Sequence, residues 1–219
     1  MTDRLLPWAV SGLVLLVAPL CSGCRSADAP AGAPAAVPPS AAAGPSSAAG
    51  LEELLLDDVP SGLPLVPDDE LDPPAGAKTI DDVARYGDDA TEQRAVLTDY
   101  GYLRGWERFW RGGDRLTTVF LDQFDDPDGA AAYADDLAHN DAEYYGGELD
   151  SAPADLPDGC VTMARDEPAP EQGMAGPAAF AWCAVGGLTV SVAVVAADPA
   201  DARTELTAVT TEQLDRLPG

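Results

Sequence analysis

The chain has 219 residues, with 12 lysines and arginines against 38 aspartates and glutamates, which gives a formal net charge of −26. All but two residues of each charge class follow Gly50. Because phosphate neutralisation needs lysine and arginine, this balance argues against binding of nucleic acid and against electrostatic binding to anionic lipid. The part after Gly50 is of ordinary single-domain size, large enough to bury a core.

An uncharged and mostly apolar stretch, LLPWAVSGLVLLVAPL, occupies residues 5–20 and follows Arg4. As a helix it would rise about 24 Å, which is less than the roughly 30 Å of a bilayer's hydrocarbon core. Pro7 and Pro19 shorten the usable helix further. This pattern is typical of the apolar region of a secretory signal rather than of a permanent membrane span.

Two cysteines follow this stretch, in LCSGCRS. Ser22 and Gly23 directly before Cys24 resemble a bacterial lipobox, in which the cysteine receives a diacylglyceryl group and a peptidase cuts on its N-terminal side. The resemblance implies a signal peptide over residues 1–23 and a membrane anchor on Cys24. The motif usually has leucine or valine where this chain has Cys21. An ordinary secreted protein and an uncleaved anchor are the alternatives. A metal half-site is not expected, because the chain lacks nearby partner ligands.

Residues 24–50 are mostly alanine, proline, serine and glycine, with Val37 as the only large apolar residue. Ordering such a segment would bury too little apolar surface to offset the lost conformational entropy. We therefore predict a disordered tether that holds residues 51–219, a single extracytoplasmic domain, on the order of 30 Å from the membrane.

Two segments of this domain align without a gap. WRGGDRLTTVFLDQFDDPDGA begins at Trp110, and WCAVGGLTVSVAVVAADPADA begins at Trp182. In each, a strand ends at a Gly-Gly turn, a second strand follows, and Asp-Pro opens a helix with the aspartate as its cap. The helices are expected over residues 128–144 and 200–217. The sequence thus predicts an α+β fold: an antiparallel sheet with helices packed on one face, built from two strand–strand–helix units.

Alternation and helical periodicity support these elements. In the second unit, one strand face is aliphatic: Leu188, Val190, Val192 and Val194. In the first unit, the counterparts are Leu116, Thr118, Phe120 and Phe124, with Asp122 as the one mismatch. The first helix has the apolar stripe Ala131, Ala134, Leu137 and Ala138, and the second has Ala202, Leu206, Val209, Gln213 and Leu217.

Upstream of the repeat, two short helices are expected in TIDDVARYG and TEQRAVLTDYG. Thr79 and Thr91 are their predicted caps, and Thr79 with Asp82 approximates a capping box. Residues 51–75 begin with the apolar LEELLL and are predicted to be an extended lead-in.

The remaining cysteines, Cys160 and Cys183, lie in two predicted strands separated by a polar loop. Outside the cytosol such a pair is expected to form a disulfide, which contributes roughly 3 kcal/mol in the chain-entropy model. Free thiols or a redox pair are the alternatives.

Catalytic motifs are absent from the sequence. His139 is the single histidine, and no serine-hydrolase, zinc-protease or Walker motif occurs. A calcium loop in FDDPDGAAAYAD is not expected, because Phe124 occupies the first ligand position. We therefore assign no catalytic residue, metal or cofactor. A glycosidase needs only two carboxylates, but among so many acidic residues no pair stands out.

The most distinctive polar stretch is YLRGWERFWRGGDR, which interleaves cations with rings. In a strand, alternate residues from Tyr102 to Trp110 share one face. The candidate binding patch consists of Arg104, Trp106, Arg108, Trp110 and Arg111, and it would suit an anionic or aromatic group. The alternative, which we favour, is that the arginines pair with local acids while their stems cover the sheet.

Together, the lipobox, the Ala/Pro tether, the GY-x-R-x-W strand, the Asp-Pro-Asp-Gly helix start and the late disulfide resemble surface lipoproteins of actinobacteria. More loosely, the domain resembles extracellular sensor and lipoprotein domains of the mycobacterial kinase-sensor kind. Lysine, isoleucine and asparagine occur once each, and their AT-rich codons indicate a GC-rich gene. The resemblance implies an antiparallel sheet with flanking helices and no established catalysis, and it carries no functional residue over to this chain.

Two functions follow from the sequence. The first is a non-catalytic module, lipid-anchored at the extracytoplasmic face of the cell membrane, that binds an envelope protein or a small ligand. The second is a carboxylate-dependent extracytoplasmic hydrolase. A pocket that brings together two carboxylates of displaced pKa would favour the hydrolase. An apolar cleft or exposed aromatic patch without them would favour the binding module.

Overall fold

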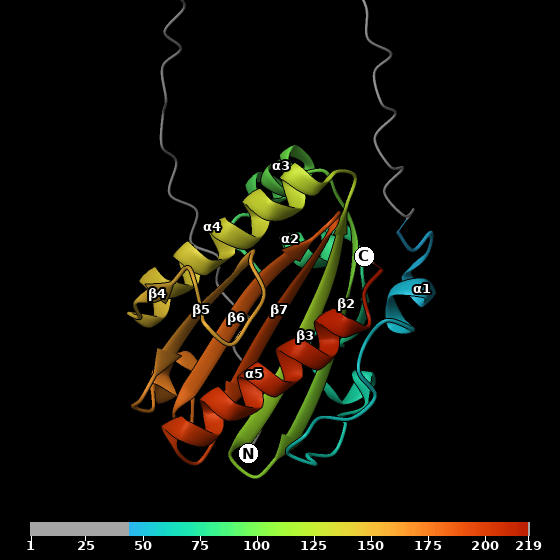
Figure 1. The fold of residues 1–219 in the computed structure, drawn as a ribbon. Coiled ribbons are helices and arrows are strands. Elements are labelled where there is room, and N and C mark those ends of the chain that lie inside the picture. Colours follow the sequence, from blue (N-terminus) through green and yellow to red (C-terminus); the bar gives the residue numbers. More distant parts are fainter. Residues whose placement is uncertain (1–43, 219) are drawn as a thin grey trace, which may run out of the picture.

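Two β-hairpins make up the centre of the structure, a computed structural model that describes residues 44–218 (Figure 1). With three further strands they form one antiparallel sheet in the order β1-β2-β3-β7-β6-β5-β4. The strands are β1 Gly76–Lys78, β2 Tyr102–Gly112, β3 Arg115–Phe124, β4 Leu149–Asp150, β5 Cys160–Arg165, β6 Ala178–Val185 and β7 Leu188–Val195. The helices are α1 Ala48–Glu52, α2 Ile80–Ala84, α3 Ala90–Asp99, α4 Pro127–Tyr145 and α5 Pro199–Asp215, with 3-10 turns at Asp68–Glu70 and Pro170–Gln172. The α+β class is confirmed.

The two hairpins are the two units of the sequence repeat. The β2–β3 turn contains Gly113 and the β6–β7 turn contains Gly186, whose φ angles of 62° and 56° suit glycine. Each second strand leads into a helix with proline in its first turn. The carboxylates of Asp126 and Asp198 accept hydrogen bonds from amides of that turn. The predicted strand–strand–helix units and their aspartate caps are therefore confirmed.

The helices of the two units lie on opposite faces of the sheet, so the prediction of helices on one face is wrong. β3 pairs with β7 so that Val119 lies opposite Val192, and both belong to the core beneath α5. Phe120, the sequence counterpart of Val192, therefore points to the other face. There, α4 packs on the sheet through Ala134 and Ala138. Each unit directs its aligned residues towards its own helix, but the register between β3 and β7 turns the two sets to opposite sides.

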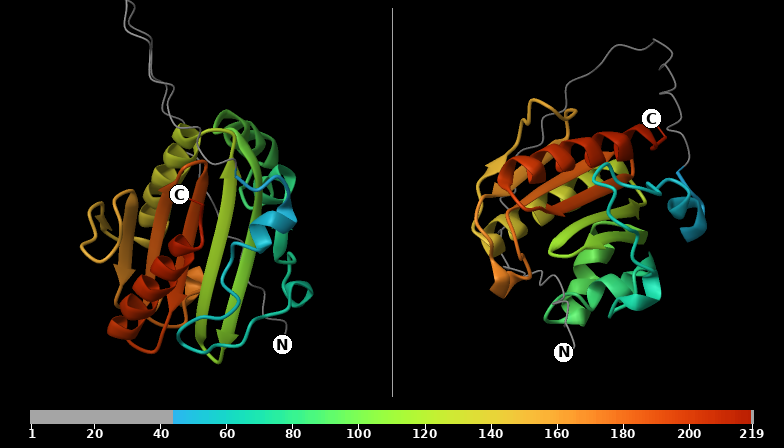
Figure 2. Two further views of the ribbon diagram at one scale, coloured as in Figure 1. Left: turned by 45° about the vertical axis from the view of Figure 1, so that its right-hand side comes forward. Right: turned by 90° about the horizontal axis from the view of Figure 1, so that it is seen from below.

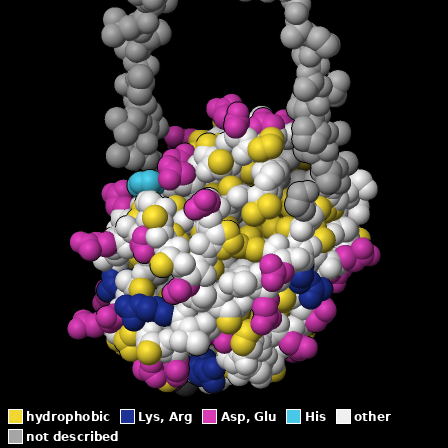
Figure 3. Space-filling model, viewed as in Figure 1, with side chains coloured by type: hydrophobic (Ala, Val, Ile, Leu, Met, Phe, Trp, Pro, Cys, Tyr) yellow, Lys and Arg dark blue, Asp and Glu magenta, His cyan; other side chains and the backbone are white. Residues whose placement is uncertain are grey.

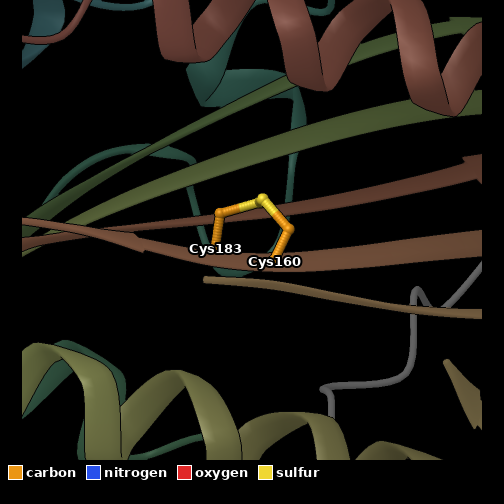
Figure 4. The surroundings of a disulfide bond; sticks show 2 residues. All are labelled: Cys160 and Cys183. Carbon is orange, nitrogen blue, oxygen red and sulfur yellow. A yellow bond between two sulfur atoms is a disulfide. The ribbon is translucent and has the colours of Figure 1, made fainter. Parts of the chain in front are cut away.

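The face beneath α5 is filled mainly by small aliphatic side chains. Its members are Val119 and Leu121 of β3, Val190, Val192 and Val194 of β7, and Ala202, Leu206 and Val209 of α5. The disulfide between Cys160 and Cys183, which are paired residues of β5 and β6, lies in the same core (Figure 4). The predicted disulfide is confirmed. We call this side of the sheet the aliphatic face.

The predicted lead-in, residues 51–75, packs against the aliphatic face. Its first two residues belong to α1, which begins at Ala48, inside the predicted tether. Leu51 and Leu55 are fully buried in the core beneath α5. Gln213 of α5 holds the chain there, because its side-chain amide accepts a hydrogen bond from the Leu56 amide at 3.1 Å and donates one to a neighbouring carbonyl at 2.9 Å.

The opposite side of the sheet is covered by α4 together with α2 and α3, as the view from below shows (Figure 2). Thr79 caps α2 and forms the predicted capping box with Asp82. For α3, the predicted cap Thr91 is wrong: Asp89 accepts the amides of the first turn, so this helix begins earlier. On α4, the expected stripe residue Ala131 is exposed. We call this side the acidic face, for the carboxyl groups described below.

Acidic side chains outnumber basic ones in the sequence, and on the face shown in Figure 3 many acidic and few basic side chains lie at the surface. Within residues 44–218, no helix is both long and apolar enough to cross a membrane. The signal peptide of residues 1–23, the lipidation of Cys24 and most of the predicted tether lie outside the described residues.

Candidate ligand pocket

The predicted arginine–tryptophan patch does not form a shared exposed surface. Trp110 is fully buried and Arg108 is 8% exposed, both covered by the segment after α1. Arg108 donates a hydrogen bond to the Leu56 carbonyl at 2.5 Å and lies 3.4 Å from the Asp57 carboxylate and 3.6 Å from that of Glu52. Arg108 therefore pairs with nearby acids while it covers the sheet, which is the alternative favoured from the sequence.

The other patch residues are spread along β2. Trp106 packs partly buried against the core of the aliphatic face, Arg104 is half-buried, and Arg111 is exposed near the turn. A β-bulge lies between Tyr102 and Arg104. Tyr102 belongs to the cluster under α2, α3 and α4 on the acidic face, so it does not continue the patch. A binding role for the five residues stays a prediction.

A pocket opens on the acidic face, between the sheet, α2 and α4. The space between its walls is about 690 Å³, a figure that includes open solvent, and the part that the centre of a water-sized sphere can occupy is about 60 Å³. The floor is formed by β2, β3, β6 and β7, while α2 and α4 form the sides. Most of the lining is apolar or aromatic, and three carboxyl groups lie among these side chains, those of Glu107, Asp122 and Asp141. The combination of apolar walls with a few convergent polar groups is typical of small-molecule sites.

Glu107 of β2 is held by two neighbours. Lys78 of β1 lies 3.0 Å from its Oε2, and both side chains are nearly inaccessible to solvent. The Tyr86 hydroxyl donates to Oε1 at 2.8 Å. Burial raises the pKa of Glu107, and the Lys78 charge and the Tyr86 hydrogen bond lower it only in part. Lys78 therefore compensates this carboxylate, and the Tyr86 hydrogen bond joins the segment after α2 to β2.

Asp122 of β3 has no such cation beside it among residues 44–218. The pKa of Asp122 is raised to about 7. Burial is the largest cause, and the charge of Glu107 adds to it, while a hydrogen bond from the Tyr102 hydroxyl acts in the opposite direction. The Tyr102 bond is 3.0 Å long and reaches Oδ1. Asp122 is therefore a carboxyl group that changes its charge near neutral pH.

Asp141 enters the pocket from the other side, on α4. The pKa of Asp141 is also raised to about 7, because the effect of burial exceeds that of a hydrogen bond with the Trp182 side chain, which lowers the pKa. Among the described residues, neither Asp122 nor Asp141 lies in an ion pair with lysine, arginine or histidine.

Aromatic rings form much of the remaining wall. Phe180 and Trp182 of β6 are stacked, with centroids 5.9 Å apart and planes inclined by 4°. Tyr133 of α4 and Tyr86, just after α2, face the same cavity. Ser191 of β7 also lines it, and its Oγ has no hydrogen-bond partner within the described part of the chain.

This arrangement can bind a molecule that combines an apolar part with hydrogen-bond donors. It can also move protons at neutral pH, since two of its acids titrate there. Residues 44–218 contain no group of three or more side chains that could hold a metal ion. His139 lies on the exposed side of α4, where its Nδ1 is 2.8 Å from the Asp135 carbonyl oxygen.

Sequence reasoning missed these pocket residues, although it met some of them as exceptions. Asp122 is the polar mismatch in an apolar strand face, and Lys78 is the single lysine. Asp141 lies seven residues after Ala134, so it continues the buried stripe of α4 with an acid. A charged residue at a core position of an element is the signal that could have found them.

The comparisons with known proteins are sparse. No protein-family model matches the chain, and no curated protein sequence matches it. Among solved structures, the chain is similar to the extracellular domain of PknH from Mycobacterium tuberculosis. The sequence identity is 14%, the TM-score is 0.48, and the match covers 78% of this chain and 96% of that domain. Similarity at this level carries no functional argument.

Proposed function

We propose that the chain is a lipid-anchored extracytoplasmic binding module and that the pocket on its acidic face is the ligand site. One observation supports this above the others: a mostly apolar and aromatic cavity that is lined by three buried acids. Burying a carboxyl group costs free energy unless it gains a partner. Three buried carboxyl groups in one cavity therefore indicate a ligand site rather than a purely structural core.

Binding is tested by blocking the cavity. Ser191 lines the floor, and Ser191→Leu would narrow the cavity with an apolar group where an unpartnered hydroxyl stands. Ser151→Leu, at an exposed loop position, is the matched control. In a ligand-observed NMR screen of small fragments, hits should bind the wild type and the control and be lost in Ser191→Leu. Hits that survive Ser191→Leu unchanged would place binding elsewhere.

The anchor is supported by the lipobox-like SGC before residue 25 and by the apolar stretch upstream. Intact mass spectrometry of the membrane-extracted protein is the test. We expect a chain that begins at Cys24 and carries a diacylglyceryl group. A mass that begins at unmodified Met1 or Thr2 would contradict the anchor.

A carboxylate-dependent hydrolase is the second candidate, favoured by the two acids of pKa about 7 in one cavity. We rank it second because Asp122 and Asp141 each have a hydrogen-bond donor beside them already, and the chain offers no catalytic histidine in the pocket. Chromogenic glycosides and esters test it: turnover that Asp122→Asn and Asp141→Asn both abolish would establish the hydrolase.

A further inference from the structure

We propose that the pocket binds a small organic cation, an ammonium group joined to an apolar body. This deepens the proposed function and depends on it. Two carboxyl groups of the cavity, those of Asp122 and Asp141, have no basic partner in the described part of the chain, and most of the other lining side chains are apolar or aromatic.

The charges of the cavity favour a cation. Glu107 is compensated by Lys78 at 3.0 Å. Asp122 and Asp141 have no ion pair with any described residue, so the cavity carries up to two uncompensated negative charges when they ionise. A ligand that fills the cavity removes water from these groups. A cation offsets that loss by pairing with the ionised carboxylates, whereas an anion adds repulsion.

Two oxygen atoms at the cavity have no hydrogen-bond donor among the described residues, and an ammonium group could donate to them. Asp122 is 7% exposed, and its Oδ1 receives the Tyr102 hydroxyl, while its Oδ2 accepts no hydrogen bond from residues 44–218. The hydroxyl oxygen of Ser191 is unpartnered as well within that range. N–H groups on a positively charged nitrogen would give Oδ2 a charge-assisted hydrogen bond, which is stronger than a neutral one.

The aromatic walls suit the same chemistry. Tyr86, Tyr133 and Trp182 line the cavity, and the faces of such rings attract cations. The protein already has one contact of this kind at the edge of the site, because Lys78 Nζ lies 5.9 Å from the centroid of the Tyr86 ring. Val83 and Leu137 on the two helices supply apolar contact for the rest of the ligand, so a bare metal ion would leave them unused.

The cavity also predicts how binding depends on pH. Burial raises the pKa of both aspartates to about 7, so at pH 5 they are protonated and an ammonium ligand must displace those protons. The groups that face Asp122 are Tyr102 and Glu107 of β2 and Tyr133 of α4. Glu107 in turn is bound by Lys78 of β1 and by Tyr86, just after α2. The groups that face Asp141 are Trp182 of β6 and Tyr133 and Tyr145 of α4. Affinity for a cation should therefore rise from pH 5 to pH 8.

Three probes of one shape test the proposal on the full chain, purified in detergent: phenethylamine as the cation, 2-phenylethanol as the neutral compound and phenylacetate as the anion. Titrations followed by NMR or calorimetry at pH 8 should show binding in the order cation, neutral compound, anion. Lowering the pH to 5 should weaken the cation about tenfold or more and leave the neutral probe unchanged or slightly tighter.

Asp122→Asn and Asp141→Asn keep the shape of the side chains and remove their charge. Each should weaken phenethylamine on the order of tenfold and flatten its pH dependence. Asp158→Asn, an exposed acid in the loop before β5, is the control and should bind as the wild type does. Circular dichroism and thermal unfolding check that each variant is folded.

Several results would overturn the proposal. Equal affinity for phenethylamine and 2-phenylethanol would reject the cation while leaving a binding pocket in place, provided that Ser191→Leu abolishes both. Phenethylamine affinity that is unchanged in both asparagine variants would also reject it. If none of the three probes binds at millimolar concentration while fragments of other chemistry do, the cation is wrong and the proposed function stands.

Discussion

The two faces of the sheet present different kinds of side chain from the same strands. On the aliphatic face, β3 and β7 present valine and leucine to α5 and to the segment after α1, and a disulfide closes the same core. On the acidic face, the alternate residues of the same strands include Asp122 and Ser191, and a cavity remains between them and α4. Neighbouring residues of one strand thus serve a closed core and an open site.

The difference shows how stability and binding are divided in this fold. The core of the aliphatic face consists mainly of small branched side chains, whereas aromatic rings and buried acids line the cavity on the other side. The aliphatic face can supply the burial that offsets the cost of desolvating the carboxyl groups opposite. Substitutions and pH changes on each face should therefore have different consequences for stability and for binding.

The buried pair of Lys78 and Glu107 should matter most on the acidic face. Lys78→Met keeps the length of the side chain but leaves the Glu107 carboxylate buried without its cation. We expect a loss of about 3 to 5 kcal/mol in the free energy of unfolding, measured with urea at neutral pH.

A double variant controls for the lost packing around Lys78. Lys78→Met with Glu107→Gln removes the charge as well as its partner, and most of the lost stability should return. If the single variant were as stable as the wild type, the pair would have no structural role on this face.

Matched leucine truncations compare the faces directly. Leu121 is fully buried on the aliphatic face, so Leu121→Ala leaves a cavity in a closed core and should cost about 3 kcal/mol. Leu137 borders the pocket and is only partly buried, so Leu137→Ala should cost about 1 kcal/mol. Chemical denaturation measures both, and equal losses would contradict the division between the faces.

The acidic face should also respond to pH where the aliphatic face cannot. The folded protein holds Asp122 and Asp141 at a pKa of about 7, well above the ordinary value of 3.8, so it binds protons that the unfolded chain has released. The free energy of unfolding should therefore fall as pH rises from about 4 to about 7 and level off above it.

The size of this pH effect is best measured as a difference. Relative to a variant with both Asp122→Asn and Asp141→Asn, the wild type should lose on the order of 1 kcal/mol per group between pH 6 and pH 7. A constant difference from pH 4 to pH 8 would show that neither acid is perturbed by burial.

The smallest effects concern helix caps on the two faces. Thr79→Ala removes the cap of α2, which forms one wall of the pocket, and Ser47→Ala removes that of α1 on the aliphatic face. Each should cost up to about 1 kcal/mol in thermal or urea unfolding. Only Thr79→Ala should also weaken binding of a pocket ligand, and an equal effect of Ser47→Ala on binding would contradict this.

Much of the fold follows from local patterns in the sequence. Glycine turns at Gly113 and Gly186 and the Asp-Pro helix starts mark both hairpins and their helices, because these residues act within a few positions along the chain. Cys160 and Cys183 could be paired because both lay in predicted strands. By contrast, α1 and its packing could not be predicted, since Leu51 and Leu55 meet α5 only after the whole chain has folded.

The candidate site was less predictable than the fold. The arginine–tryptophan strand drew attention because its composition is unusual, yet Trp110 and Arg108 are covered by a segment that precedes them by some fifty residues. Glu107, Asp122 and Asp141 are ordinary acids in a chain with 38 of them, and only their burial distinguishes them. Burial is a property of the packed structure, so composition and spacing do not reveal it.

The two hairpins, the capped helices, the disulfide and the acidic surface could be predicted from the sequence, because turns, caps and alternation depend on residues close together along the chain. The face that each helix covers depends instead on contacts between distant segments. That choice lies in the pairing of Val119 with Val192, which joins residues of different units. A shift of one residue in this register would exchange the faces of a strand, so the same alternating pattern could have placed Asp122 in the closed core. The pocket exists because the register keeps it on the other side.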